Sequence, residues 1–309
     1  MNFNFLDILY LLHQYYLCNL ELKITDISRV WPINNTNQKE LDEKAPLVTI
    51  ITAVLNGEKY LEKTINSIIS QSYKNIEYII IDGGSTDNTL NIIKSYERKI
   101  HYWISEKDQG ISDAFNKGVK QANGVYINFQ GDGDGFIEPN SLEKVFQGVN
   151  PNEDIFVSAR IHRVNLEGKN IYTSKYIKKF HKSSLLFRMS LPHQGLFTHK
   201  NYFEEYGLFD TDCTFCMDYD HLLRSYRNFP RVITKDVVVA RWREDGIGNG
   251  KSLDIYRDYD LVKKKHKVAN TIVLLMIKYW ILLKYYSKVI LNLNWYVRLH
   301  NNYAYPKLL

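Results

Sequence analysis

The chain has 309 residues, of which 45% are hydrophobic and 24% are charged, enough apolar sequence to bury a globular core. Its net charge of +6 suits anionic partners such as nucleotide phosphates or acidic lipid headgroups, and because no nucleic-acid-binding motif is present we expect no nucleic-acid partner. The three cysteines, Cys18, Cys213 and Cys216, are too few for a disulfide framework, so we expect free thiols in a reducing compartment.

Residues 1–45 are expected to form a helical extension followed by a linker. Positions 1–20 are rich in apolar and aromatic residues at helical spacing, and positions 33–45 are polar. The N-terminus lacks the basic region and the cleavage site of a secretory signal. No stretch reaches the roughly 18 uninterrupted apolar residues of a membrane span. We therefore expect a cytoplasmic protein.

From position 46 the sequence predicts alternating strands and helices. Continuous apolar, β-branched runs at 47–55, 76–81, 100–104 and 125–129 are typical of buried parallel strands. The segments between them have the apolar spacing of helices, over 58–70, from Thr86 or Asp87 to Tyr96, and over 110–122. This alternation predicts an α/β fold, Rossmann-like, with a mostly parallel sheet and helices on both faces.

After Pro139 the pattern changes. Residues 155–164 and 170–177 are expected to form an antiparallel pair, followed by helices at 200–206 and 218–228 and a strand at 231–240. We therefore assign one domain to residues 46–250, with a first half at 46–138 and a second half at 139–250.

The tail, residues 251–309, is expected to be helical, basic and aromatic. Its apolar block is interrupted by Lys278, Lys284 and Lys288, so it is not expected to span a membrane. Lysines beside tryptophan and tyrosine suit a helix lying at a membrane surface. A helix packed on the protein's own surface is the alternative, and the sequence leaves both open.

Polar residues follow the predicted strands at the edge where open parallel sheets bind ligands. Asn56 and Glu58 follow the first strand, Asp82 the second, and Asp132 and Asp134 the fourth. Each cluster contains glycines, which let a backbone approach a ligand closely. One such cluster could be a helix-capping turn, but several at one sheet edge favour a binding site.

The spacing Asp132-Gly133-Asp134 indicates a metal site. Carboxylates repel phosphates unless a cation lies between them, and Mg²⁺ or Mn²⁺ is commonly held by one or two carboxylates together with substrate phosphates. We therefore expect Mn²⁺ or Mg²⁺ at Asp134 and Asp132.

The segment 46–134, including LVTIITAVLNGE, IIIDGGSTDNT and NFQGDGD, resembles family 2 of the inverting glycosyltransferases, and in particular enzymes that build bacterial surface polysaccharides. The resemblance continues more loosely to about residue 250 through LPHQGLF and MDYDHLLRSY. It implies a GT-A fold. It also implies inverting, metal-dependent transfer of a hexosyl or N-acetylhexosaminyl group from a nucleotide-sugar to a saccharide or lipid-linked saccharide.

The resemblance implies roles for individual donor-side residues. The segment from Ala53 through Asn56 to Glu58 would contact the nucleoside, Asp82 would hydrogen-bond the base, and Asp113 would line the nucleotide pocket. These positions suit UDP but equally admit dTDP or GDP.

The remaining implied roles concern the cation and the chemistry. Asp132 and Asp134 would occupy the metal-binding motif, with Asp134 the better-matched ligand because many relatives keep an Asp at position 134 but have Ser in place of Asp132. Asp218 would be the general base. Asp220 is a rival, but at i and i+2 on a helix only one of the two can face the site.

Two further features of the resemblance bear on function. The His193-Gln194 segment resembles the family's acceptor side. Met217 stands where the family often has Glu, and this departure motivates an alternative function, a non-catalytic nucleotide-sugar-binding or regulatory protein. The basic tail would give peripheral contact with the cytoplasmic face of the inner membrane.

Overall fold

The computed structural model describes residues 45–213, 215–244, 246 and 252–291. The predicted N-terminal extension and the last 18 residues of the tail lie outside these ranges, as does Cys18. The predicted division at residues 138 and 250 stays a prediction.

The first half of the sheet is parallel, as predicted. Its strands are β1 (Val48–Val54), β2 (Ile76–Asp82), β3 (Tyr102–Ser105) and β4 (Tyr126–Gly131), in the order β3-β2-β1-β4. Every residue of β1 is buried, which explains its uninterrupted apolar and threonine sequence. Ala53 lies opposite both Ile81 and Gly131, so three strands end at the same level.

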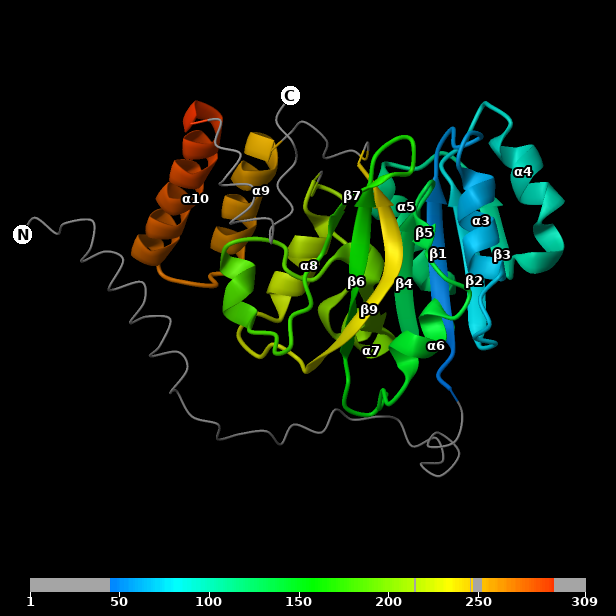
Figure 1. Ribbon diagram of the computed structural model, residues 1–309, viewed down its shortest axis with the longest axis horizontal. Helices are drawn as coiled ribbons and strands as arrows, with labels where there is room; N and C mark the ends of the chain where they lie inside the picture. The colour runs from blue at the N-terminus through cyan, green and yellow to red at the C-terminus, as the bar shows by residue number, and fades with distance from the viewer. Residues whose placement is uncertain (1–44, 214, 245, 247–251, 292–309) are drawn as a thin grey trace, which may run out of the picture. The chain divides into compact units, whose positions relative to one another are not determined.

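Helices cover both faces of this sheet, as predicted (Figure 1). On one face lie α3 (Leu61–Ile69), α4 (Thr89–Ser95) and α6 (Ser141–Phe146). On the other lie α5 (Ile111–Gln121), α7 (Lys200–Tyr206) and α8 (Met217–Arg224). The helix α4 begins later than expected, at Thr89, because the Asp87 carboxylate accepts the Thr89 N–H at 3.0 Å.

The second half of the sheet is mixed, so the expected mostly parallel arrangement holds only for the first half. Its strands are β5 (Gly135–Phe136), β6 (Phe156–Val164), β7 (Asn170–Thr173), β8 (Leu196–His199) and β9 (Val232–Arg243). The predicted antiparallel pair is confirmed as β6 and β7. The order continues β4-β8-β6-β9-β5, with β6 and β9 parallel and the other neighbours antiparallel.

Three short 3₁₀ helices complete the described elements of this region: η1 (Glu97–Lys99), η2 (Lys182–Leu186) and η3 (His193–Gly195). The last of these precedes β8 directly. Two side chains of β4 hold it in place, because Asn128 Nδ2 and Gln130 Nε2 both donate to the Gln194 carbonyl, at 3.2 and 3.0 Å. The segment that was predicted to lie on the acceptor side is therefore fixed to the fourth strand.

The described part of the tail forms two helices, α9 (Ser252–Lys265) and α10 (Thr271–Leu291), which lie next to each other at one end of the molecule (Figure 1). Ile277 and Ile281 of α10 pack with Leu186 of η2. Within the described ranges, no helix has the length and apolar character required to cross a membrane. The predicted helical, basic tail is thus confirmed over 252–291.

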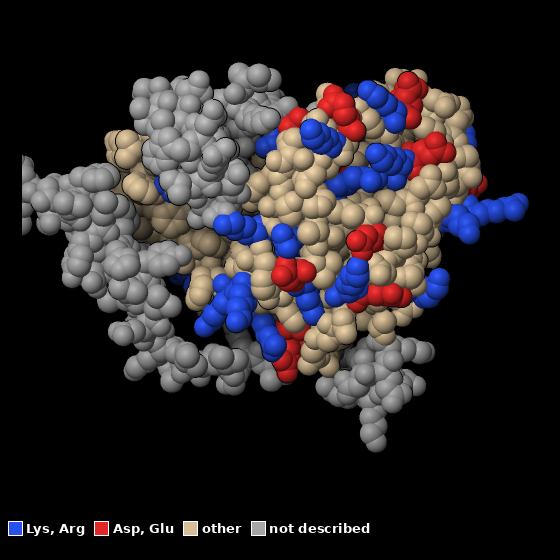
Figure 2. Space-filling view, in the orientation of Figure 1, with Lys and Arg blue, Asp and Glu red and all other residues tan. Residues whose placement is uncertain are grey.

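Charged side chains of both signs are interspersed on the face shown in Figure 2. The excess of positive charge is therefore not gathered into a single stripe over the described surface of that face. In the cavity described below, by contrast, basic lining residues outnumber acidic ones.

Candidate active site

The polar loops that follow β1, β2 and β4 meet at one edge of the sheet. The end of β1 is hydrogen-bonded to the start of the loop after β2, since Gly83 N donates to the Val54 carbonyl at 2.9 Å. A Cβ placed on Gly57 would clash with Val54 Cγ2 and lie 3.2 Å from Asp132 Oδ2, so the absence of a side chain at Gly57 lets the β1 loop pack closely beside Asp132. The structure thus brings the predicted donor-side segments together.

Asn56 and Glu58, which were predicted to contact the nucleoside, bind the loop after β2. Asn56 adopts a positive φ of 53°, its N–H donates to Ser85 Oγ at 2.7 Å, and its Oδ1 accepts the Thr86 N–H at 2.9 Å. Glu58 Oε2 accepts the Asn88 N–H at 2.9 Å. Both residues are exposed to solvent. Their contact with a nucleoside stays a prediction.

Asp82 is fully buried and organises the same loop. Its Oδ2 accepts the Gly84 N–H at 3.2 Å, the Ser85 N–H at 3.0 Å and the Ser105 hydroxyl at 2.6 Å, while its Oδ1 accepts the Ser85 hydroxyl. A contact with the base, which stays a prediction, would have to use the remaining capacity of Oδ1. Sequence reasoning missed the two serines.

Ala53 and Asp113 flank this loop cluster. Ala53 is nearly buried and packs in the apolar cluster that includes Ala114 of α5. Asp113 lies in the first turn of α5, where its carboxylate accepts the Gln109 N–H at 3.1 Å and lies 3.6 Å from Lys117 Nζ. Their predicted roles toward the nucleotide remain predictions.

Asp134 is buried and held by three hydrogen bonds. Its Oδ1 accepts the Arg243 N–H at 3.0 Å, and its Oδ2 accepts Gln194 Nε2 at 3.0 Å and the Gly131 N–H at 3.3 Å. Burial raises the pKa of the Asp134 carboxyl to about 7, and the nearby Asp132 adds to the rise, although the hydrogen bonds oppose it. Two neighbouring carboxylates therefore repel each other at this edge.

The donor atoms at this edge fit a divalent cation shared with a substrate. No set of three or more His, Cys, Asp or Glu side chains within the described ranges could hold a metal alone. Mg²⁺ and Mn²⁺ do not require such a set, because substrate phosphates supply further oxygen ligands. Asp134 Oδ1 accepts only one of the hydrogen bonds described, and a cation would relieve the repulsion with Asp132.

The strand β9 brings two arginines to this edge that sequence reasoning missed. Arg241 lies opposite Gly135, and its Nε is buried without a hydrogen-bond partner in the described parts of the chain. The Arg243 guanidinium lies 3.6 Å above the centre of the Tyr60 ring. Alternate residues of a strand share a face, so the Arg-Trp-Arg run at positions 241–243 could have signalled paired cations.

The two acids of α8 have different environments. Asp220 is fully buried and bonded to Arg224 at 2.8 Å, Lys265 at 2.9 Å and His266 at 2.8 Å. Burial alone would raise the pKa of Asp220, but these hydrogen bonds outweigh it and hold the pKa well below its usual range. Asp220 therefore joins α8 to the end of α9, and its carboxylate has no room for a substrate.

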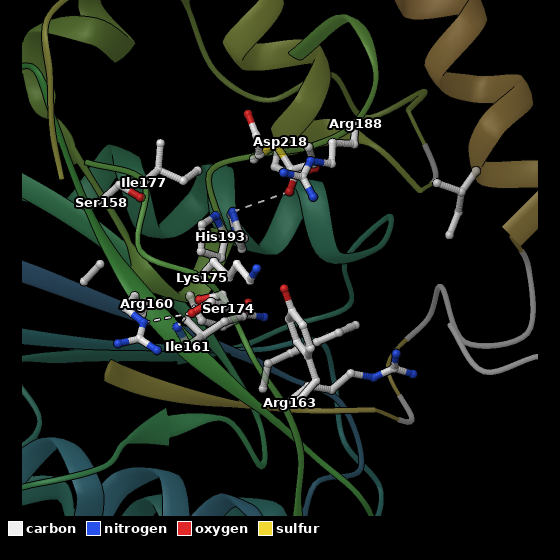
Figure 3. Close-up of a pocket in the computed structure, with 18 of the residues that line it drawn as sticks. Ser158, Arg160, Ile161, Arg163, Ser174, Lys175, Ile177, Arg188, His193 and Asp218 are labelled. Carbon is white, nitrogen blue, oxygen red and sulfur yellow. Dashed lines mark hydrogen bonds and ion pairs between the residues drawn. The ribbon is translucent and has the colours of Figure 1, made fainter. Parts of the chain in front are cut away.

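Asp218 instead borders a cavity of 420 Å³. Its Oδ2 lies 4.0 Å from Nδ1 of His193, the contact marked by a dashed line in Figure 3. The His193 ring stacks on Phe129 at 5.3 Å between centroids, and burial lowers its pKa. The neighbouring Met217 packs inward and accepts a hydrogen bond from the Ser112 hydroxyl at 3.0 Å.

Gln194 connects the two parts of the site. It lines the cavity beside Asp218, and its side chain donates to Asp134. The predicted metal ligand is therefore hydrogen-bonded to a residue that lines the same cavity as the predicted base. Cys213 and Cys216, just before α8, are free thiols as predicted, with their sulfur atoms 2.8 Å apart.

A family model described as "Glycosyl transferase family 2" matches residues 49–224, more than half of the chain. The chain is 30% identical over 224 residues to an uncharacterized glycosyltransferase of Rickettsia typhi, covering 70% of each protein. It is 31% identical over 211 residues to a PGL/p-HBAD biosynthesis glycosyltransferase of Mycobacterium bovis, covering 65% of this chain and 78% of that one.

Solved structures show the same fold at low sequence identity. The 1–349 fragment of TarS from S. aureus in complex with UDP aligns with a TM-score of 0.59 and 16% identity, over 81% of this chain and 76% of that one. The mannosyltransferase PcManGT from Pyrobaculum calidifontis in complex with GDP-Man and Mn²⁺ aligns with a TM-score of 0.57 and 15% identity, over 87% and 76%. This likeness agrees with the GT-A fold expected from the sequence.

Proposed function

The chain belongs to glycosyl transferase family 2, and on that premise we propose that it is an inverting, metal-dependent enzyme. It transfers a sugar from a nucleotide-sugar to a saccharide or lipid-linked saccharide in surface polysaccharide biosynthesis. One observation carries this proposal: Asp218 borders a cavity whose lining includes Gln194, and Gln194 is hydrogen-bonded to Asp134. The proposed base thus borders the cavity, and the proposed cation-binding carboxylate is hydrogen-bonded to a residue of the cavity wall, which suits transfer between two bound substrates.

In this mechanism Asp218 accepts the proton of an acceptor hydroxyl held in the cavity. The hydroxyl oxygen bonds to the anomeric carbon from the side opposite the nucleotide. The bond from that carbon to the diphosphate oxygen breaks, and its electron pair leaves with the nucleotide. A single displacement inverts the anomeric centre without a covalent intermediate on the protein. A positioned base typically contributes about 10²–10⁴-fold to the rate.

Asp134 and Asp132 would hold Mn²⁺ or Mg²⁺ together with oxygens of the donor diphosphate. When bound, the cation would offset the negative charge that grows on the departing diphosphate. The protein contributes directly at this place, because Gln194 and the Arg243 N–H fix the Asp134 carboxylate. Arg241 and Arg243 add positive charge on the same edge.

The donor is proposed to be a UDP-linked hexose or N-acetylhexosamine. Support comes from the TarS fragment, whose structures are described in complex with UDP and with UDP-GlcNAc. We assign the nucleoside contacts to Ala53, Asn56, Glu58, Asp82 and Asp113, and the hydrogen bonds that Asn56, Glu58 and Asp82 make to the loop at 83–88 support a shared site for these three.

A peripheral contact with the cytoplasmic face of the membrane is proposed for α10. Five exposed apolar or aromatic residues recur at intervals of three or four along this helix and therefore share one face: Ile272, Leu275, Tyr279, Leu283 and Tyr286. Lys278 is half exposed beside this face. Tyrosines and a flanking lysine suit the boundary of an anionic lipid surface.

A thermal-shift screen of nucleotide-sugars with Mn²⁺ and Mg²⁺ tests the donor, and a transfer assay with the stabilising donor then tests the activity. We expect UDP-linked sugars with a divalent cation to raise the unfolding temperature, and transfer to follow when acceptor is added. Stabilisation by GDP- or dTDP-linked sugars alone would contradict the donor assignment. Donor binding without turnover in the presence of lipid-linked saccharides would favour the non-catalytic alternative.

A further inference from the structure

The two acids assigned to the reaction are contacted by neighbouring residues of one short turn. Gln194 Nε2 donates to Asp134 Oδ2 at 3.0 Å, and His193 Nδ1 lies 4.0 Å from Asp218 Oδ2. Figure 3 marks the second contact with a dashed line. Both residues belong to η3, and both line the cavity. Consecutive residues of a single turn therefore reach the proposed base and the proposed cation ligand.

The backbone of this turn is held by buried side chains of β4. The amides of Asn128 and Gln130, which are fully buried, donate to the Gln194 carbonyl at 3.2 and 3.0 Å. Asn128 also donates to the Leu196 carbonyl at 2.9 Å, and Gln130 Nε2 donates to Asn128 Oδ1 at 2.7 Å. Moving the turn would leave these buried groups unpaired, at about 1–3 kcal/mol for each. The turn is therefore a rigid support.

The ring of His193 is held as firmly as its backbone. It stacks on Phe129 of β4 with 11° between the ring planes, and the rings of Phe115 and Phe209 lie 5.8 and 6.3 Å away between centroids. Burial lowers the pKa of His193 although Asp218 opposes the shift, so the ring is neutral at pH 7. A side chain enclosed in this way loses little further rotamer entropy when it contacts a partner.

The surroundings of the two ring nitrogens favour one tautomer. A neutral imidazole carries a single N–H. Nε2 of His193 is buried without a hydrogen-bond partner among the described residues, whereas Nδ1 lies beside the Asp218 carboxylate. A hydrogen on Nδ1 is attracted by that carboxylate, while a lone pair there would be repelled. The separation of 4.0 Å exceeds a hydrogen bond, and such contacts at active sites commonly shorten once substrates bind.

The other oxygen of the Asp218 carboxylate is held by α8 itself. Its Oδ1 accepts the Tyr219 N–H at 2.8 Å. Tyr219 is fully buried, and its ring stacks on Tyr259 of α9 at 4.1 Å between centroids. One oxygen is thus fixed by the helix, and the other lies beside His193. Each keeps a lone pair for an acceptor hydroxyl, because a carboxylate oxygen can accept two hydrogen bonds.

We propose that the turn η3 sets the separation and orientation of the two acids. His193 positions the base Asp218 through Nδ1–H, and Gln194 positions the cation ligand Asp134. This inference rests on the proposed function, which assigns those roles to the two acids. Both residues of the turn act through the acid that they contact, so we call them positioning residues. A misplacement of about 1 Å at reacting groups can cost about 10²-fold in rate.

NMR of the full chain with ¹⁵N-labelled histidine tests the His193 contact without any substrate. We expect the His193 signals, identified by their absence in His193→Asn, to show a neutral ring protonated on Nδ1 at pH 7. Asp218→Ala removes the carboxylate and should abolish this preference, whereas the tautomers of the buried His199 and His221 should not change. A His193 ring protonated on Nε2 in the wild type, or one that does not respond to Asp218→Ala, would overturn the assignment.

Manganese titration followed by electron paramagnetic resonance, with saturating UDP, tests the Gln194 contact. Gln194→Leu removes the donor to Asp134 and should weaken Mn²⁺ binding by about 10–100-fold, while leaving the His193 tautomer unchanged. Gln121→Leu, at an exposed glutamine of α5, is the matched control and should bind Mn²⁺ as the wild type does. Equal Mn²⁺ affinity in the Gln194 variant and the control would overturn the role of Gln194.

Transfer kinetics test whether the His193 contact matters to the reaction. His193→Leu keeps a similar volume without either nitrogen, so kcat should fall about 10–100-fold with both KM values and Mn²⁺ affinity unchanged. His193→Asn keeps an N–H near the position of Nδ1 and should restore kcat to within about fivefold of the wild type. His221→Asn is the control, because His221 packs on the same Phe209 ring outside the cavity wall, and kcat of the folded protein should not change. Equal kcat losses in the Leu and Asn variants of His193 would contradict positioning through Nδ1.

These readouts separate the inference from the proposed function. If the wild type binds no Mn²⁺ with UDP while His193 shows the Asp218-dependent tautomer, the cation proposal fails and the His193 contact stands. If Mn²⁺ and UDP bind and transfer proceeds, but the substitutions at His193 and Gln194 change neither the tautomer, the Mn²⁺ affinity nor kcat, the inference about η3 fails alone.

Discussion

The two halves of the sheet contribute to the site in different ways. After β1 and β2, the polar residues are bonded mainly to one another: Asn56, Glu58 and Asp82 each accept N–H groups of the loop at 83–88. In the second half, Asp218 and His193 border an open cavity. The proposed donor edge is thus held by hydrogen bonds within the protein, whereas the proposed acceptor side is an open cavity. Substitutions on the two sides should therefore fail in different ways.

The largest effect is expected when the proposed general base is removed. Asp218→Asn removes the base and should lower kcat by about 10²–10⁴-fold while leaving donor affinity unchanged. Steady-state transfer rates and UDP titrations measure the two quantities. Asp212→Asn, an exposed acid just before α8, is the control and should keep full activity. Full activity in Asp218→Asn would remove Asp218 from the mechanism.

The next largest effect concerns Asp220, which we expect to stabilise the fold and to have no role in catalysis. Asp220→Asn leaves the partly buried Arg224 without its counter-charge and should lower the free energy of unfolding by about 3 kcal/mol. Chemical denaturation measures it. Donor affinity of the folded fraction should be unchanged. A stable but inactive Asp220→Asn protein would instead make Asp220 the base.

The ion pairs of Asp220 also predict how the free energy of unfolding depends on pH. The pKa of Asp220 is lower in the folded protein than in the unfolded chain, where it is about 3.9. The stabilisation that ionised Asp220 provides is therefore complete at pH values above its pKa in the unfolded chain. It is lost as the pH falls toward the pKa of Asp220 in the folded protein. The stability difference between wild type and Asp220→Asn should persist at pH 5 and shrink below pH 4. A difference that grows as the pH falls below 4 would contradict this.

A smaller effect probes the donor edge. Ser105→Ala removes a hydroxyl that donates to the buried Asp82 carboxylate, so it should cost about 1.5–3 kcal/mol of stability and weaken UDP binding by loosening the loop at 83–88. Ser95→Ala is the control, because Ser95 is exposed and bonds only within its helix. Unchanged UDP affinity with lowered stability would show that loop order does not limit donor binding.

The smallest effect concerns α10. Leu275→Glu should weaken binding to anionic phospholipid vesicles by about 1 kcal/mol, or about fivefold, while changing stability little because Leu275 is 44% exposed. Vesicle flotation measures it. Leu166→Glu, an exposed leucine in the turn between β6 and β7, is the matched control. Equal losses in both variants would argue against a membrane-binding face.

The sequence predicted the first half of the fold well because each buried parallel strand is a continuous apolar run. The ends of these runs also marked Asp82 and Asp134 correctly as residues of one sheet edge. The very short strand β5 and the four-residue β8 give no comparable pattern, so the mixed half of the sheet was only partly predicted.

The sequence indicated the acidic residues of the candidate site but not the residues that form hydrogen bonds with them. Helical periodicity indicated that only one of Asp218 and Asp220 could face a substrate; in the structure Asp218 borders the cavity and Asp220 is buried against Arg224, Lys265 and His266. The contacts that decide between them, however, come from residues 45 or more positions away, Lys265 and His266. Likewise, Asp134 is bound by Gln194 and Arg243, 60 and 109 residues distant, which no local pattern reveals.

The central claim is that a divalent cation at the end of β4 holds the donor diphosphate. Anomalous diffraction from crystals soaked with UDP and Mn²⁺ tests it most directly. We predict a manganese peak beside the carboxylate of Asp134, with the diphosphate oxygens completing its coordination. A manganese ion and UDP bound together at any other place on the protein would contradict the account.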